Sequence, residues 1–449
     1  MKRLFGTNGI RGTVNEDMTV ELAAKVGRAA GRFMKGTVAI ASDTRVSRDM
    51  IKQAVSAGLM ASGCNVIDLG TIPTPALQYF VKIRTETVGG IMITASHNPP
   101  NFNGIKCVSS DGTEMSREDE EAIETNYYND DGDDDVRIGR MRRETGAEET
   151  YIDAVISNVD ADAIRAAGLR AVLDCANGAS YATAPLLLKK LNVKTRTLNA
   201  DAQGEFPGHD SEPTEENLKD LIEMMRRGGS DIGIAHDGDA DRTVFVSAKG
   251  EYVSGDKSLA LIAASELARK KGTVVTPVSS SSMVEEVIVA AGGKVKYTAV
   301  GSPIVARTMM TSDAIFGGEE NGGLIFPDMQ FCRDGAMTVA KMLEAIVKNG
   351  PLSKQIKTLP VYHTYKFKIE CDDEGKEKLM KIFAREKYDN SRKDKTDGIK
   401  LIYDNGWVLL RPSGTEPIFR IYSESKEMSV AKARGEEFVG RSKEYLVSK

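Results

Sequence analysis

Residues 37–55, TVAIASDTRVSRDMIKQAV, place a β-branched run before a Ser/Asp-rich turn and a segment with helical spacing of its apolar residues. The same order recurs at 169–188, LRAVLDCANGASYATAPLLL, and at 272–292, GTVVTPVSSSSMVEEVIVAAG. A strand, a turn and a helix in succession form the repeating unit of an α/β domain. Because the three copies begin more than 100 residues apart, the sequence predicts three related α/β domains rather than a short solenoid repeat.

The pattern changes after about residue 365, where YKFKIECDDE, GIKLIYDNGWVLLRPS and FRIYSES surround a charged helical stretch. These segments predict a smaller C-terminal α+β domain with an antiparallel sheet. A chain of 449 residues suits about three or four domains of ordinary size. We therefore predict an α/β protein of four domains, at residues 1–150, 151–252, 253–364 and 365–449.

The acidic stretch NDDGDDD at 129–135 lies near the first predicted boundary. Like charges at this density resist packing, so we expect a solvated loop. Metal binding by this stretch is the weaker alternative.

The composition is that of a soluble globular protein, with 41% hydrophobic residues, 28% charged residues and a mean hydropathy of −0.29. A net charge of −5 argues against nucleic acid as a partner, because that surface needs clustered Lys and Arg. No apolar segment follows the basic N-terminal residues, and no run approaches the roughly 18 apolar residues of a membrane span. We expect a cytoplasmic protein without a membrane partner. The five cysteines are odd in number and lack a CxxC pair, which disfavours a disulfide framework or a zinc site.

The strongest local signal is SDIGIAHDGDADRTVFV at 230–246. Two apolar β-runs flank a tight loop that carries Asp237, Asp239 and Asp241 at alternate positions. Three carboxylates this close repel one another unless a cation lies between them, and a set of oxygen ligands suits Mg²⁺. The loop predicts one Mg²⁺ site per chain; the alternative is an Asp-rich hairpin turn without metal.

A second signal is GWVLLRPSGTEPIFRIY at 406–422. A predicted strand delivers Arg411, and Ser413, Gly414 and Thr415 follow it. The guanidinium fork, the hydroxyls and the free backbone N–H groups match the oxygens of a phosphate. The alternative is an ordinary Pro/Gly turn between two strands.

Two glycine-rich loops carry further polar groups. AIFGGEENGGLIFPD at 314–328 presents Glu319 and Asn321 on what we expect to be a flexible, exposed loop, where their oxygens and amide suit sugar hydroxyls. FGTNGIRG at 5–12 places Arg11 where it could reach an anionic site. The alternatives are a glycine-rich surface turn and a solvated arginine.

The stretch IMITASHNPPNFNGIK at 91–106 ends an apolar run at Thr94 and then presents Ser96 and His97 beside an Asn-Pro-Pro turn. A serine nucleophile with its histidine base is one interpretation. Adjacent residues on one turn point different ways, however, and no other histidine has an obvious Asp partner. We favour a phosphorylated Ser96, whose phosphate would be the missing oxygen ligand beside the three aspartates. The prolines would stiffen the turn so that Ser96 faces a cleft.

Four motifs, TASHNPPNFNGIK, DGDADR, GEENGG and RPSGTEP, stand in this order, one in each predicted domain. The set resembles the α-D-phosphohexomutases, the family that contains phosphoglucomutase/phosphomannomutase and phosphoglucosamine mutase. The resemblance implies a heart-shaped enzyme, with three related α/β domains on mixed sheets, a smaller C-terminal domain and an active site in the central cleft. It also implies isomerisation of a hexose phosphate through a phosphoserine and a bisphosphate intermediate.

The resemblance further implies roles for single residues. Ser96 matches the phosphoserine, which binds Mg²⁺ together with Asp237, Asp239 and Asp241. The other matches are Arg11 and Arg242 near the transferring phosphate, Lys106 in proton transfer, His97 steadying the phosphoserine loop, Glu319 and Asn321 on sugar hydroxyls, and Arg411, Ser413, Gly414 and Thr415 on the non-transferring phosphate. Two positions depart from the family: Gly323 stands where several relatives have a histidine proposed as acid/base, and Asn321 replaces the more usual serine.

The sugar is the open question. FGTNGIRG and RPSGTEP look more like phosphoglucosamine mutases, which favours conversion of glucosamine 6-phosphate to glucosamine 1-phosphate and a role in amino sugar biosynthesis. Glu319 could pair with a 2-ammonium group. GEENGG matches neither group, so a mutase of mannose or glucose phosphates is the alternative. An aspartate-nucleophile phosphatase using the DxDxT pattern at 239–243 and a non-catalytic sugar-phosphate sensor are weaker candidates. The sequence predicts no oligomeric state.

Overall fold

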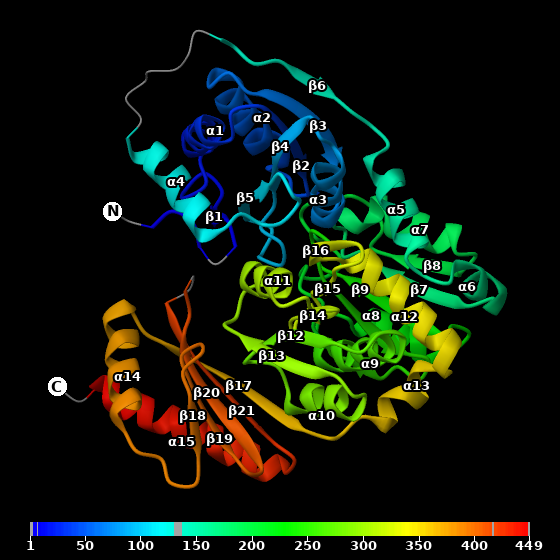
Figure 1. Cartoon of the computed structure of the whole chain (residues 1–449), viewed down its shortest axis with the longest axis vertical. Coiled ribbons are helices and arrows are strands. Elements are labelled where there is room, and N and C mark those ends of the chain that lie inside the picture. The colour runs from blue at the N-terminus through cyan, green and yellow to red at the C-terminus, as the bar shows by residue number, and fades with distance from the viewer. Residues whose placement is uncertain (1–2, 7, 130–136, 415–416, 448–449) are drawn as a thin grey trace.

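The computed structural model describes residues 3–6, 8–129, 137–414 and 417–447, and within them the chain forms four sheets. Three of these sheets are mixed and carry α/β units, and the fourth is antiparallel. The units follow one another along an arc, with the N-terminal and the C-terminal units at its two ends (Figure 1). The predicted fold class, three related α/β domains and a smaller C-terminal α+β domain, is confirmed.

The first unit is a mixed sheet flanked by helices. Its strands are β1 (Ile10–Thr13), β2 (Thr37–Ser42), β3 (Asn65–Thr71), β4 (Thr87–Ile93), β5 (Phe102–Ser109) and β6 (Met141–Arg143), and its helices are α1 (Val20–Met34), α2 (Arg48–Ala61), α3 (Thr74–Ile83) and α4 (Arg117–Tyr128). The order in the sheet is β1-β5-β4-β2-β3-β6, with β5 antiparallel to both neighbours. Thr19 caps α1 by accepting a hydrogen bond from Leu22 N.

The second unit has the order β11-β10-β9-β7-β8. These strands are β7 (Arg170–Asp174), β8 (Lys194–Leu198), β9 (Ile232–His236), β10 (Thr243–Ser247) and β11 (Tyr252–Val253), with the helices α5 (Ala147–Ser157), α6 (Ala161–Ala167), η1 (Ala179–Ala182), α7 (Ala184–Lys190) and α8 (Lys219–Arg226). Strands β9 and β10 pair antiparallel, and the loop between them carries the DGDADR motif.

The third unit has the order β13-β12-β14-β15-β16. Its strands are β12 (Thr273–Pro277), β13 (Lys294–Thr298), β14 (Phe316–Gly318), β15 (Leu324–Phe326) and β16 (Gln330–Arg333), and its helices are α9 (Gly255–Arg269), α10 (Ser282–Ala290), α11 (Ser302–Thr311), α12 (Gly335–Asn349), α13 (Leu352–Gln355) and η2 (Ile356–Thr358). The turn between β14 and β15 carries the GEENGG motif.

The C-terminal unit is an antiparallel sheet with the order β17-β21-β20-β19-β18. Its strands are β17 (His363–Glu370), β18 (Arg392–Asp394), β19 (Ile399–Tyr403), β20 (Gly406–Pro412) and β21 (Ile418–Ser425), with the helices α14 (Asp373–Arg385) and α15 (Met428–Val447). The RPSGTEP motif occupies the end of β20 and the turn before β21.

The apolar cores show how the units are joined. One cluster runs from α3 of the first unit through α5 and α12 to the sheets of the second and third units. The C-terminal sheet has its own core. A small cluster of Val278, Trp407, Leu409 and Tyr422 connects it to the third unit. The first three units therefore share packing that the fourth largely lacks.

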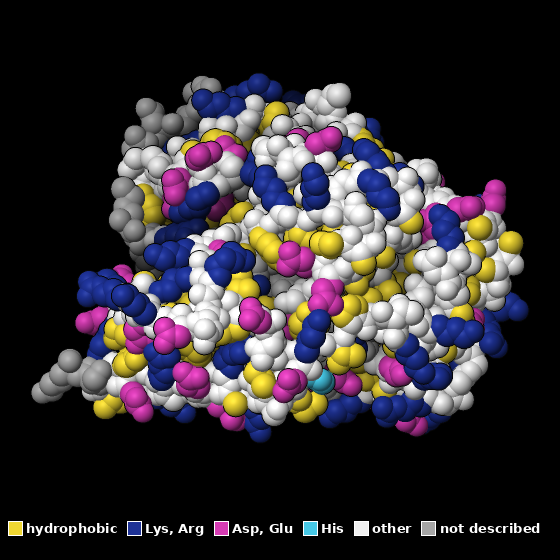
Figure 2. Space-filling view, turned by 60° about the horizontal axis from the view of Figure 1, so that its bottom comes forward, with side chains coloured by type: hydrophobic (Ala, Val, Ile, Leu, Met, Phe, Trp, Pro, Cys, Tyr) yellow, Lys and Arg dark blue, Asp and Glu magenta, His cyan; other side chains and the backbone are white. Residues whose placement is uncertain are grey.

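Three sequence predictions can be compared with the fold. The strand, turn and helix order at 37–55, 169–188 and 272–292 is confirmed, since β2, β7 and β12 lead to α2, α7 and α10. The acidic stretch at 129–135 lies, apart from Asn129, outside the described residues. No described helix combines the length and the apolar character that crossing a membrane requires. The face in Figure 2 mixes acidic and basic side chains without a broad field of one sign.

Candidate active site

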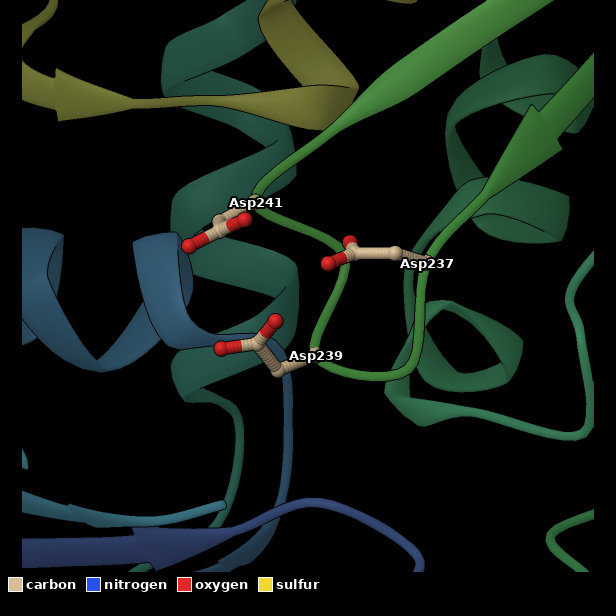
Figure 3. Close-up of side chains that lie close together, drawn as sticks. All are labelled: Asp237, Asp239 and Asp241. Atoms are coloured by element: carbon tan, nitrogen blue, oxygen red, sulfur yellow. The ribbon is translucent and has the colours of Figure 1, made fainter. Parts of the chain in front are cut away.

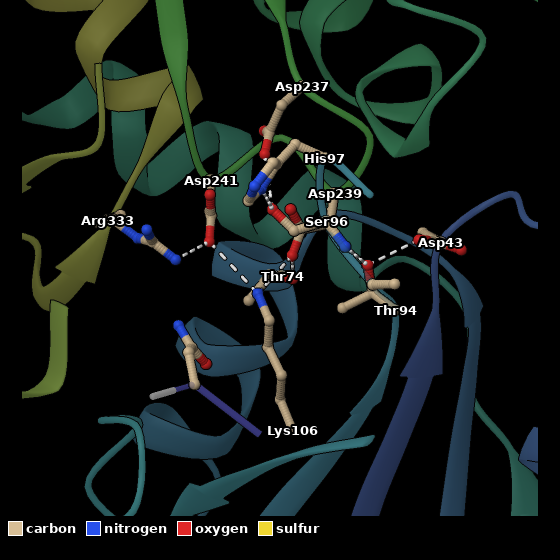
Figure 4. Close-up of polar contacts among 12 residues, drawn as sticks. Asp43, Thr74, Thr94, Ser96, His97, Lys106, Asp237, Asp239, Asp241 and Arg333 are labelled. Atoms are coloured by element: carbon tan, nitrogen blue, oxygen red, sulfur yellow. Dashed lines mark hydrogen bonds and ion pairs between the residues drawn. The ribbon is translucent and has the colours of Figure 1, made fainter. Parts of the chain in front are cut away.

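Ser96 lies in the loop that joins β4 to β5. It has a left-handed backbone conformation, with φ 53°. Its Oγ donates a hydrogen bond to Asp237 Oδ2 at 2.9 Å and lies 3.3 Å from His97 Nδ1. Our expectation that the two adjacent side chains point different ways is wrong, because the left-handed residue turns the chain so that both side chains face the aspartates (Figure 4).

Ser96 is also more enclosed than the sequence predicts. It has no exposed surface, because the aspartate loop and His97 close over its hydroxyl. Burial lowers the pKa of His97 well below its usual value, and the charges of Arg242 and Arg11 lower it further. A neutral imidazole can accept a proton, but the base of a catalytic triad also needs a carboxylate on its second nitrogen. The main influences on His97 are burial and two arginines, which fits the loop-steadying role better.

The three aspartates converge, as the sequence predicts. Asp237, Asp239 and Asp241 come from the loop between β9 and β10, and their carboxylates face one another (Figure 3). One oxygen from each lies within 4.8 Å of the others, and all three residues are buried. Ala240 has φ 58°, which bends the loop and lets alternate side chains turn to the same side.

Cationic side chains surround these carboxylates (Figure 4). Lys106 Nζ lies 2.6 Å from Asp239 Oδ2 and 3.4 Å from Asp241 Oδ2. Arg333 Nη2 lies 2.5 Å from Asp241 Oδ2. Arg242 Nε lies 3.7 Å from Asp241 Oδ1 and 3.9 Å from Asp237 Oδ2. The structure therefore brings Lys106 and Arg242 into the site, as predicted, and adds Arg333.

The carboxylates differ in their proton affinity. Burial raises the pKa of Asp237 well above its usual value, and repulsion from Asp241 and Asp239 adds to this. Burial also acts on Asp239, but the ion pair with Lys106 and the hydrogen bond from Thr74 Oγ1, at 2.7 Å, lower its pKa overall. The ionised form of Asp237, the partner of Ser96, is therefore one that a cation beside it would stabilise.

The cluster fits a divalent cation. Within the described residues, Asp239 Oδ1 and Asp241 Oδ1 are buried without a hydrogen-bond partner. Burying charged oxygens without partners is costly, and a cation held between them removes that cost. An all-oxygen donor set suits Mg²⁺ rather than a softer metal.

Arg11 reaches the same region from β1. Its Nη1 donates to Asn98 Oδ1 at 2.7 Å and to Ala95 O at 3.2 Å. Burial lowers the pKa of Arg11 to about 10, although Asp239 opposes this. Arg11 therefore stays protonated at neutral pH and is not the solvated arginine of the alternative interpretation.

The loop between β14 and β15, which the sequence predicts to contact sugar hydroxyls, differs from its prediction. Glu319 is only 3% exposed, so an exposed loop is wrong at this position: Arg333 Nη1 lies 3.2 Å from Glu319 Oε2 and holds the side chain inside. Asn321 is half-buried, and its Oδ1 accepts from Gly323 N at 3.0 Å. A Cβ at Gly323 would lie 2.3 Å from Arg333 Cδ. Arg333 thus occupies the space that a side chain at position 323 would need.

A cavity of about 380 Å³ adjoins this loop. It opens between the second, third and C-terminal units and is lined by Glu212, Arg242, Asp256, Glu320, Asn321 and Lys366, among others. Arg242 contacts the aspartates as well, so the cavity begins where the aspartate cluster ends.

The predicted phosphate loop lies in the C-terminal unit. Arg411 stands near the end of β20, and its Nε lies 3.0 Å from Asp397 Oδ2. Ser413 is buried and its N donates to Ile418 O, whereas Gly414 is exposed. Thr415 lies outside the described residues. Arg411 is paired within the C-terminal unit and does not reach the aspartate cluster. The predicted site residues therefore form two groups, one around the aspartates and one in the C-terminal unit.

Sequence reasoning missed Arg333, Thr74 and Asp397. Arg333 acts on Asp241 and Thr74 acts on Asp239, both across a long span of chain, whereas Asp397 acts on Arg411 from the preceding part of the same unit. None lies in a motif. The only sequence signal was a charged residue after Phe331 and Cys332, where Arg333 ends β16.

Four domain models of one family cover nearly the whole chain. Those of phosphoglucomutase/phosphomannomutase match residues 2–133 for alpha/beta/alpha domain I, 149–250 for domain II, 254–362 for domain III and 368–440 for the C-terminal domain. Full-length relatives are 42% identical. The chain belongs to this family. It is therefore a phosphohexomutase, an isomerase.

The relatives carry different names. A "Phosphoglucomutase/phosphomannomutase" of Thermococcus kodakarensis is 42% identical over 97% of this chain and 96% of its own. A "Probable phosphoglucosamine mutase" of Methanopyrus kandleri is 42% identical over 98% and 97%. A "Phosphoglucosamine/phosphogalactosamine mutase" of Sulfurisphaera tokodaii is 37% identical over 96% and 97%.

A crystal structure of a phosphoglucomutase/phosphomannomutase family protein from Burkholderia thailandensis superposes with a TM-score of 0.88 at 25% identity, over 99% of this phosphohexomutase and 98% of that chain. The boundaries predicted near residues 150, 252 and 364 stay predictions, as do the roles of single site residues.

Proposed function

We propose that this phosphohexomutase interconverts glucosamine 6-phosphate and glucosamine 1-phosphate through a phosphorylated Ser96. The observation that carries the mechanism is the hydrogen bond of 2.9 Å from Ser96 Oγ to Asp237, inside a cluster of carboxylates and cations. Relatives named as phosphoglucosamine mutases support the choice of sugar.

The residues divide the chemistry between them. Ser96 Oγ gives its phosphoryl group to the free hydroxyl of the hexose monophosphate: the Oγ–P bond breaks, the new P–O bond forms, and one proton moves from the sugar hydroxyl to the leaving Oγ. Lys106, a cation among the carboxylates, is the group we assign to that proton transfer: its ammonium gives a proton to the leaving Oγ and regains one from the sugar hydroxyl. The leaving Ser96 Oγ takes up that proton, and the free hydroxyl then donates its hydrogen bond to Asp237 Oδ2. The bisphosphate then reorients, and Ser96 takes the phosphate from its other end.

Asp237, Asp239 and Asp241 would hold one Mg²⁺ together with an oxygen of the phosphoserine. When bound, the ion supplies charge neutralisation for the transferring phosphoryl group. Arg11 and Arg242 add positive charge close to the same place, which stabilises the anionic transition state without reorganisation.

Sugar recognition falls to the other side of the site. Asn321 hydrogen-bonds to sugar hydroxyls. Glu319 accepts hydrogen bonds from other sugar hydroxyls while its ion pair with Arg333 keeps it in place. Arg411, Ser413, Gly414 and Thr415 bind the phosphate that is not being transferred. The ion pair of 3.0 Å between Arg411 and Asp397 has to rearrange when the phosphate arrives.

The cavity beside Asn321 supports an amino sugar. Burial raises the pKa of Asp256 to about 7, and repulsion from Glu320 adds to this. A substrate ammonium group would relieve both costs. Glu320 already has Lys366 at 4.0 Å, so Asp256 is the carboxylate that we expect to meet the ammonium.

A phosphatase with an aspartate nucleophile is less well supported. Asp239, the first residue of its DxDxT pattern, is engaged by Lys106 and Thr74. Thr243, the last residue, donates to Gly335 O at 3.1 Å. Both side chains are therefore already engaged by contacts within the protein.

Two measurements test the proposal. Intact mass after incubation with a hexose 1,6-bisphosphate should show one phosphoryl group on the wild type and none on Ser96→Ala, which should also lose mutase activity. Normal activity of that variant would overturn the mechanism. Parallel kcat/KM values for glucosamine, mannose and glucose phosphates test the sugar, and a clear preference for a neutral hexose would replace glucosamine as the substrate.

A further inference from the structure

Arg45 lies beneath the Ser96 loop and has no exposed surface. Its guanidinium uses all five of its N–H donors. Nε pairs with Asp43 Oδ2 at 3.2 Å, and the remaining donors reach backbone carbonyls of the loop. Those carbonyls belong to Ser96 and Asn98, at 2.9 and 2.6 Å from Nη2, and to Pro99 and Phe102, at 2.6 and 2.9 Å from Nη1.

Asp43 holds the other side of Ser96 through Thr94 (Figure 4). Thr94 Oγ1 donates to Asp43 Oδ2 at 2.6 Å and accepts from Ser96 N at 2.8 Å. The Asp43–Arg45 pair therefore holds Ser96 at two backbone groups: at its N–H through Thr94 and at its carbonyl oxygen through Arg45. From the second unit, the ring of Phe206 lies 5.0 Å from the guanidinium and covers it.

This support answers a strain in the backbone. The left-handed region is unfavourable for a residue other than glycine, and such a conformation persists only where its surroundings determine it. Ser96, with φ 53°, is such a residue. Hydrogen bonds to a charged donor are stronger than neutral ones. Because Arg45 makes four of them to one short loop, it can hold the strained turn.

We propose that the buried Asp43–Arg45 pair fixes the left-handed conformation of Ser96 and so positions its Oγ for phosphoryl transfer. The inference rests on the proposed function for the catalytic consequence, though not for the structural one. Arg45 is a positioning residue, since it touches the loop backbone and not the reacting atoms. Lysine cannot replace it, because an ammonium has three donors and no planar fork.

Two variants test the pair from its two sides. Arg45→Lys keeps the charge beside Asp43 but loses the fork, and Thr94→Val keeps the shape but loses both hydrogen bonds. Lys52→Met is the matched control: it breaks the buried Lys52–Asp68 ion pair of 2.9 Å in the same unit, away from the Ser96 loop. All three should remain folded by circular dichroism.

Hydrogen exchange is the first readout, because it does not depend on activity. We expect the amides of residues 94–102 to exchange at least tenfold faster in Arg45→Lys and Thr94→Val than in the wild type, and at the wild-type rate in Lys52→Met. Steady-state kinetics are the second readout. A displacement of about 1 Å at the reacting atom can cost about 100-fold in rate, so kcat should fall between tenfold and 100-fold while KM stays within threefold.

The outcomes separate the two proposals. Faster exchange together with a lower kcat supports the inference. Unchanged exchange in both folded variants overturns it, whatever the activity, as does a wild-type kcat in both. If Arg45→Lys does not fold, Thr94→Val decides alone. A wild type that never gains a phosphoryl group at Ser96 would instead refute the proposed function, and the exchange rates would still decide whether the pair holds the loop.

Discussion

Replacing Lys106 with methionine removes a buried cation from the aspartate cluster. Lys106 is 2% exposed, and its Nζ lies 2.6 Å from Asp239 and 3.4 Å from Asp241. Removing one partner of a buried ion pair costs about 3–5 kcal/mol, because the other charge stays buried without compensation. We expect Lys106→Met to lower the unfolding free energy of the Mg²⁺-free protein by about this amount.

Mg²⁺ should restore much of that loss. A ligand that binds only the folded chain stabilises it by about 2.7 kcal/mol at 100 times its Kd. In the wild type, Lys106 competes with the ion for the charge of Asp239 and Asp241. The variant lacks this competitor, so Mg²⁺ should bind it more tightly and stabilise it more than the wild type.

Urea unfolding with and without Mg²⁺, followed by circular dichroism, measures both effects. EDTA-treated protein supplies the metal-free state. Lys52→Met is again the control, since it breaks a buried pair of the same unit at a distance from the cluster; it should be destabilised without gaining extra response to Mg²⁺. The reasoning fails if Mg²⁺ stabilises the wild type and Lys106→Met equally, or if Lys106→Met is as stable as the wild type without the ion.

Two further predictions concern Lys400, at the contact between the third and C-terminal units, and Gly323, beside Arg333. The ring centre of Trp407, the single tryptophan of the chain, lies 4.1 Å from Lys400 Nζ. Burial lowers the pKa of Lys400 to about 8, so the tryptophan emission should change with a midpoint near pH 8. Lys400→Met should abolish this change. In the unfolded chain Lys400 keeps its proton up to about pH 10, so this lysine should make the free energy of unfolding rise between pH 8 and about pH 10. A fall of the unfolding free energy over this range in urea titrations would contradict the assignment. Gly323→Ala should push Arg333 aside, since the new Cβ would lie 2.3 Å from its Cδ, costing about 1–3 kcal/mol of stability and lowering mutase activity. Gly440→Ala, which meets nothing within 4 Å, should do neither, and equal effects of the two changes in activity and urea assays would contradict the clash.

Local sequence patterns predicted much of the fold because strands and helices repeat their apolar residues every two to four positions, and turns depend on a few adjacent residues. The segment 37–55 becomes β2, a turn and α2. The aspartates converge because one tight loop carries all three. Both predictions needed only neighbouring residues.

The errors have one physical cause. Glycine-rich sequence predicted an exposed loop at Glu319, yet Arg333, far along the chain, neutralises that carboxylate and allows its burial. The side-chain directions of Ser96 and His97 followed a rule for ordinary turns, and the left-handed Ser96 breaks that rule. The support that permits this conformation comes from Arg45, about 50 residues earlier. Contacts between residues this far apart in the chain produce no local sequence pattern from which they could be predicted.

Arg333 joins two loops that the sequence presents as separate motifs. Its guanidinium contacts Asp241 of the loop between β9 and β10 with one nitrogen and Glu319 of the loop between β14 and β15 with the other. A fork that binds two carboxylates has a fixed geometry, so a shift of either loop changes the position of the other. Glycine at position 323 leaves room for this side chain. The absence of a side chain at 323 therefore has a structural reason: the space serves the link between the loop that would hold the metal and the loop that would read the sugar.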